Sequence, residues 1–151
     1  MHQEGIVHND LGLENMMIKV GDQIEAKWLD FGYAREGRDS STERRWPGGR
    51  WHWAAPECRN YNKFGQRSDV WSLGAIFHVL LVGMIPPPTE SYITANNFVL
   101  DKWVADAGYT KLVDQMLTYE YVRRPPLALV VTRFVCLLEQ KPVDKCLAIR
   151  Y

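Results

Sequence analysis

The fold of this chain is decided by the stretch HNDLGLEN at residues 8–15. It holds a carboxylate, Asp10, and a carboxamide, Asn15, and residues 6–15 around it lack helical or strand periodicity and read as a loop. A carboxylate can orient a hydroxyl group and accept its proton, and an amide oxygen can hold a magnesium ion against phosphate groups. The stretch therefore predicts a loop that carries the residue types needed for phosphoryl transfer.

Two further motifs follow at intervals that fit this chemistry. Short strands are predicted at residues 16–19 and 25–28, and a hairpin there would return the chain to the loop just before Asp30-Phe31-Gly32. Asp30 would add a second hard oxygen ligand for magnesium. Residues 30–53 lack periodicity and predict a long loop, which ends at Ala55-Pro56-Glu57.

The rest of the chain reads as helical. Apolar residues recur at three- and four-residue steps after Ser68 or Asp69, either of which could be the N-cap, and Gly83 ends this pattern. Shorter helices are predicted at residues 96–106 and 110–117, and a longer one at 127–140. The expected fold class is mainly α with a small β-hairpin region, in one domain of ordinary globular composition.

Taken together, these segments resemble the catalytic loop, the DFG turn and the APE motif of eukaryotic-type protein kinases. The stretch SDVWSLG at residues 68–74 resembles the start of the central helix of the kinase C-terminal lobe, GMIP at 83–86 the turn after it, and Arg124-Pro125 a late arginine motif. The resemblance implies a kinase C-lobe over residues 1–140, followed by a tail at 141–151. Its parts would be the catalytic loop (8–15), the activation segment (30–57) and a helical subdomain (68–140).

The resemblance also assigns roles to individual residues. Asp10 would be the catalytic base, and Asn15 and Asp30 would bind Mg²⁺ and thereby the cofactor ATP. His8 would be a packed loop residue, and Phe31, beside Gly32, a packing switch beneath the site. Asp69 would anchor the catalytic-loop backbone. Glu57 and Arg124 would form a buried structural ion pair.

Three residues depart from the family pattern. Asn9 stands where most kinases have an arginine that reads a phosphate on the activation segment. Gly12 stands where Ser/Thr kinases have a lysine that approaches the transferred phosphate. Arg50 stands in place of a threonine, and we expect it to pair with Asp10 and lower the basicity of that carboxylate. These departures give the chain pseudokinase-like features.

The N-terminal kinase lobe is expected to be absent, because neither a Gly-rich phosphate loop nor a strand lysine precedes His8. The sequence thus predicts ATP-dependent phosphoryl transfer to a protein hydroxyl, with this truncated chain inactive by itself. Ser/Thr specificity is favoured by its frequency among kinases, although residues 52–57 have Tyr-kinase-like features. The alternatives are a pseudokinase or scaffold that binds a partner protein, and a fragment without function.

Net charge, hydropathy and the N-terminal pattern limit the classes of partner and the location expected for this chain. Lys plus Arg and Asp plus Glu number 18 each, so no net charge favours nucleic acid or an anionic membrane. The longest apolar run, residues 73–85, is too short and interrupted to span a bilayer. The N-terminus has no secretory signal pattern, so a cytoplasmic or nuclear location is expected. The expected partners are a protein substrate and ATP, the latter held partly by the missing lobe; the oligomeric state stays open.

Overall fold

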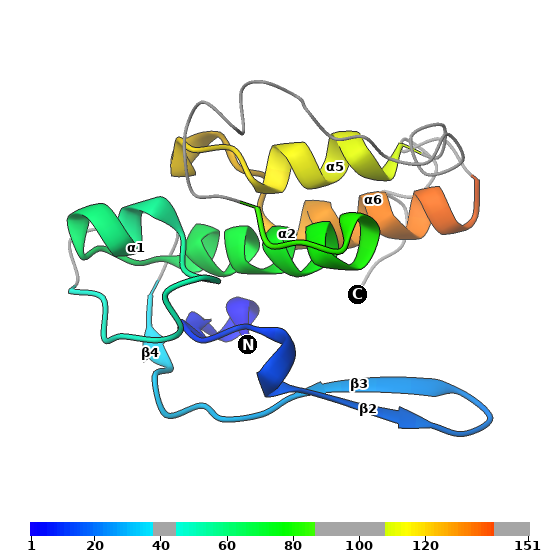
Figure 1. The fold of residues 1–151 in the computed structure, drawn as a ribbon, viewed down its shortest axis with the longest axis horizontal. Helices are drawn as coiled ribbons and strands as arrows, with labels where there is room; N and C mark the ends of the chain where they lie inside the picture. The colour runs from blue at the N-terminus through cyan, green and yellow to red at the C-terminus, as the bar shows by residue number, and fades with distance from the viewer. Residues whose placement is uncertain (38–44, 87–107, 141–151) are drawn as a thin grey trace.

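The computed structural model describes residues 1–37, 45–86 and 108–140, and four α-helices are the main regular elements of these residues (Figure 1). They are α1 (Pro56–Tyr61), α2 (Gln66–Val82), α5 (Tyr109–Met116) and α6 (Leu127–Leu138). Short 3-10 helices span His2–Glu4, Leu13–Asn15 and Tyr121–Arg123. The predicted class, mainly α with a small β-hairpin region, is confirmed for the described residues.

Helix α2 is the central element, and α5 and α6 pack against it. Its apolar residues lie on all sides of the helix, as is typical of a helix buried within a fold. The predicted N-cap at Ser68 or Asp69 is wrong, because the helix begins two residues before Ser68. Ser68 lies in the first turn, and its hydroxyl accepts a hydrogen bond from the N–H of the N-cap Gly65 at 3.1 Å. The predicted end at Gly83 is confirmed.

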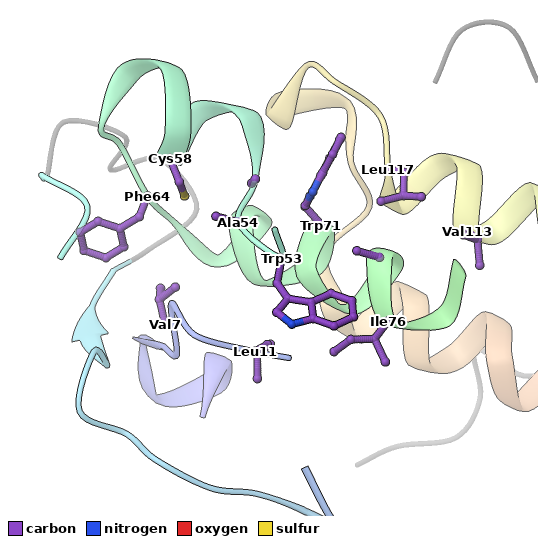
Figure 2. Close-up of a cluster of buried hydrophobic side chains, with 12 residues drawn as sticks. Val7, Leu11, Trp53, Ala54, Cys58, Phe64, Trp71, Ile76, Val113 and Leu117 are labelled. Atoms are coloured by element: carbon purple, nitrogen blue, oxygen red, sulfur yellow. The ribbon is translucent and has the colours of Figure 1, made fainter. Parts of the chain in front are cut away.

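The core joins the N-terminal segment to the helices. Val7 and Leu11 from the N-terminal segment lie in one buried cluster with Trp53, Trp71 and residues of α5 (Figure 2). A second cluster lies between α2, α5 and α6 and contains Val70, Leu112, Met116 and Val130. The loop at residues 8–15 is therefore held against α2 by Val7, just before it, and by Leu11, in its middle.

Two small antiparallel sheets position the remaining segments. The predicted hairpin is confirmed, with β2 at Met16–Val20 and β3 at Ile24–Trp28, and it projects away from the helices in Figure 1. β1 (Ile6–Val7) pairs with β4 (Arg35–Glu36) inside segments that were predicted as loops. That prediction is wrong for these four residues, since two-residue strands are too short to show a period.

The other helix predictions have mixed outcomes. α5 and α6 confirm the helices predicted at residues 110–117 and 127–140 to within one or two residues at their ends. The helix predicted at 96–106 lies outside the described residues. α1 was not predicted, because its single apolar face is too short to reveal periodicity. Among the described helices, none is both long and apolar enough to cross a membrane.

Candidate active site

Asp10 lies at the centre of the candidate site and is 5% exposed. Its Oδ1 accepts the backbone N–H of Arg50 at 2.8 Å. Its Oδ2 accepts the Arg50 guanidinium and the Asn15 side-chain amide, both at 2.8 Å. The expected pairing of Arg50 with Asp10 is thus confirmed. Three N–H donors hold the carboxylate in one orientation.

Asn15 is buried directly beside Asp10. Its Nδ2 donates to the backbone carbonyl of Asp10 as well as to the carboxylate, at 2.8 Å in each case. These bonds define the amide orientation, because only the NH₂ group can donate to two oxygens. The Oδ1 atom consequently remains available as a ligand for a cation.

The backbone just before Asp10 is held in an uncommon conformation. Asn9 has a φ of 66°, a left-handed value that asparagine tolerates better than most residues. Asp69, from the first turn of α2, accepts the N–H groups of His8 at 2.8 Å and Asn9 at 3.0 Å. His2 also lies 2.8 Å from the Asp69 carboxylate. Asp69 is 1% exposed, so this anchor for the loop is shielded from water.

The hairpin returns the chain to the catalytic loop at Asp30. Met16 pairs with Trp28, and the N–H of Leu29 donates to the carbonyl of Asn15 at 2.8 Å. Asp30 itself is exposed, has a φ of 58°, and accepts the N–H of Gly32 at 3.0 Å. Asp30 therefore comes one residue after the backbone hydrogen bond between Leu29 and Asn15.

Phe31 lies between this turn and the loop. Its ring centroid is 4.7 Å from that of His8, which is fully buried. Phe31 is itself 53% exposed, so only one side of its ring is packed. His8 Nδ1 accepts the N–H of Asp10 at 3.3 Å, which ties the histidine to the loop that it supports.

The donor set around Asp10 fits a magnesium ion. Mg²⁺ takes oxygen ligands and usually keeps waters and substrate phosphates, so one amide oxygen and one carboxylate are a sufficient protein contribution. Asn15 Oδ1 and the exposed Asp30 carboxylate are of the required type. In the part of the chain that the structure describes, no group of three His, Cys, Asp or Glu side chains is placed to hold a metal ion. A carboxylate and an amide oxygen are the ligand types that Mg²⁺ takes when phosphate groups complete its coordination.

Glu14 connects the loop at residues 8–15 to the stretch at residues 52–53. The Trp53 indole N–H donates to Glu14 Oε2 at 2.7 Å, and His52 lies 3.3 Å from Oε1. Burial raises the pKa of the Glu14 carboxyl, but hydrogen bonds from its backbone, Trp53 and His52 outweigh burial and hold the pKa below its usual value. Sequence reasoning missed this contact, and no local pattern could have indicated it.

Glu57 and Arg124 form a bidentate ion pair, with hydrogen bonds of 2.7 and 2.8 Å. They are 6% and 1% exposed. The Ser68 hydroxyl donates to Glu57 at 2.8 Å, so the hydroxyl that accepts the Gly65 N–H also orients this carboxylate. The pair joins α1 to the segment before α6 and lies apart from the Asp10 carboxylate's partners.

Comparison with known proteins agrees with this geometry. The family model described as "Protein kinase domain" matches residues 1–131. A serine/threonine-protein kinase pakA from Talaromyces marneffei is 32% identical over 95 residues, which cover 63% of this chain and 14% of the relative. A serine/threonine-protein kinase PLK4 from Danio rerio is 32% identical over 136 residues, which cover 87% of this chain and 14% of the relative. The matched chain thus spans a small part of these relatives.

Proposed function

This chain belongs to the protein kinase domain family, and on that premise we propose that its site serves ATP-dependent phosphoryl transfer to a protein hydroxyl group. The proposal is carried by one observation, the buried Asp10 carboxylate oriented by Asn15 and by the backbone of Arg50. A fixed carboxylate beside a free amide oxygen provides a base and a cation ligand within one loop.

In the proposed reaction, Asp10 orients the hydroxyl group of the substrate and accepts its proton. The hydroxyl oxygen forms a bond to the terminal phosphorus of ATP while the bond to the ADP oxygen breaks. Asn15 and Asp30 would hold Mg²⁺, which offsets charge on the phosphate oxygens when it is bound. Asp69 acts through the backbone, since it fixes the peptide groups that lead into Asp10.

Serine or threonine is proposed as the acceptor residue. The relatives named above are described as serine/threonine kinases, and this description is the support for the choice. The Tyr-kinase-like features at residues 52–57 make tyrosine the competing acceptor. Peptide mixtures that contain all three hydroxyl residues separate these specificities directly.

The test uses the natural protein that contains this domain, labelled ATP and such a peptide mixture. Removal of a general base reduces the rate by about 10²–10⁴-fold, so Asp10→Asn should lower transfer by that factor. Asp22→Asn is the matched control, because Asp22 lies exposed in the hairpin turn and should leave the rate unchanged. Transfer that is undiminished in Asp10→Asn would exclude Asp10 as the base.

A non-catalytic binding module is the second candidate. Asn9 favours it, because the side chain of Asn9 donates to the carbonyls of Val7 and Tyr33 and offers no cation to a phosphorylated activation segment. A scaffold would retain partner binding in the Asp10→Asn variant and show no transfer in the unmodified protein. The labelled-ATP experiment therefore separates the two candidates.

A further inference from the structure

The end of the activation segment packs unusually closely on the catalytic loop. Gly49 has a φ of 130°, and a Cβ atom there would lie 2.4 Å from the carbonyl oxygen of Asn9. Only glycine permits this approach. It places the next residue, Arg50, where both its backbone N–H and its guanidinium reach Asp10.

Position 12 cannot supply a charge to the site. A Cβ atom on Gly12 would lie 2.5 Å from the Trp53 indole ring, and Trp53 is held there by its hydrogen bond to Glu14. Trp53 is 3% exposed and its carbonyl accepts the Ser72 hydroxyl at 2.9 Å, so it belongs to the core. The space beside Gly12 is therefore filled by an uncharged ring.

Arg50 brings a positive charge to the same site through its contact with Asp10. Among the described residues, its guanidinium donates one hydrogen bond, to Asp10 Oδ2, and its side chain is 33% exposed. A guanidinium carries five N–H donors, so the others remain available for an anion. Planar guanidinium groups bind phosphate oxygens in a bidentate manner.

The contact leaves Asp10 competent as a base. An ionised carboxylate has about four lone-pair positions. Three N–H donors occupy Asp10, two on Oδ2 and one on Oδ1. One lone pair of Oδ1 therefore remains for the proton of a substrate hydroxyl, while the Arg50 guanidinium stays on Oδ2.

We propose that Arg50 is a catalytic residue that contacts the transferred phosphoryl group and supplies the cation that position 12 lacks. The inference rests on the proposed function. Charge that develops on the phosphoryl oxygens during transfer would be stabilised by the guanidinium N–H groups that Asp10 does not use. Asp10 in turn holds the guanidinium in place.

The test measures kcat and KM for ATP and peptide in the natural full-length protein. Arg50→Gln keeps the planar donors but removes the charge, and we expect kcat to fall about 100-fold, with both KM values changed far less. Arg50→Lys should retain more activity than Arg50→Gln. Added guanidinium ion, below its unfolding concentration, should restore part of the rate of Arg50→Ala. Arg45→Gln is the control, since Arg45 is exposed in the same segment and should retain the full rate.

Each outcome has a definite meaning. An unchanged or higher kcat in Arg50→Gln overturns the inference and leaves the proposed function standing. Absence of transfer in the unmodified protein overturns both. Urea unfolding checks that Arg50→Gln is folded. If it is not, the inference is tested instead by the rate of the folded Arg50→Lys variant and by guanidinium rescue of Arg50→Ala. A lysine variant as slow as a folded alanine variant, without rescue, then overturns the inference.

Discussion

Arg124 shows how one buried charge becomes fully satisfied. Its five N–H groups donate to the two oxygens of Glu57 and to the carbonyls of Arg67, Thr118 and Tyr119. The guanidinium also lies 4.9 Å from the centre of the Trp71 ring. A buried guanidinium with this many partners cannot be lost without leaving Glu57 and several carbonyls unpaired.

Replacement of Arg124 should therefore strongly destabilise the protein. Arg124→Met should lower the free energy of unfolding by about 3–5 kcal/mol, because the Glu57 carboxylate would remain buried without its partner. Arg123→Met is the matched control, since Arg123 forms an exposed pair with Glu120. Its loss should cost less than about 1 kcal/mol. Equal midpoints of urea unfolding for the two variants would contradict this assignment of the buried pair.

Cys58 should make the stability of the folded protein depend on pH in the alkaline range. Burial and the nearby Glu57 carboxylate raise the pKa of its thiol from 9.0 to about 12. The folded protein thus retains the proton above pH 9, where the unfolded chain releases it, and stability falls as pH rises from 9 toward 12. Unfolding free energies measured over this range should decline more steeply for the wild type than for Cys58→Ala. Parallel slopes would mean that the thiol titrates normally in the folded protein.

At the scale of the element, the contact between α2 and α5 depends on Gly74. A Cβ atom there would lie 2.9 Å from the Cβ of Met116 and 3.2 Å from the Leu117 side chain. Gly74→Ala should gain about 0.5–1 kcal/mol of helix propensity but lose about 1–3 kcal/mol to overpacking, so the net change is destabilising. Gly21→Ala, where the nearest atom is 3.9 Å away, should be close to neutral in thermal unfolding. A higher melting temperature for Gly74→Ala would show that the two helices separate at little cost.

Elements with a repeating pattern were predictable, and contacts across the fold were not. Periodicity located α2, α5, α6 and the β2–β3 hairpin, because each presents a regular spacing of apolar residues or a turn signal. The two-residue strands β1 and β4 have no such spacing. The hydrogen bond from Trp53 to Glu14 joins residues 39 positions apart, and no local preference encodes it. The positions of Asp10, Asn15 and Asp30 were suggested by motif, whereas the close packing at Gly49 required the structure.

At the scale of the whole molecule, the site is assembled from three distant segments. The loop at residues 8–15, the turn at Asp30 and the stretch at 49–53 meet only because β2–β3 and α2 hold them. The stability of the fold and the arrangement of the site residues are therefore coupled. Variants that loosen α2 should also disturb Asp10, since Asp69 connects the two.

A polypeptide of residues 1–151 alone is expected to show no measurable phosphoryl transfer. Its sequence contains no Gly-rich phosphate loop of the G-x-G-x-x-G type, and two oxygen ligands alone position ATP poorly because Mg²⁺ relies on phosphates that are already held. The measurement compares this polypeptide with the natural protein under the same labelled ATP. Asp10→Asn in each background separates genuine transfer from contaminating kinases. Transfer by residues 1–151 that Asp10→Asn abolishes would show that this half of the site holds ATP without a phosphate loop.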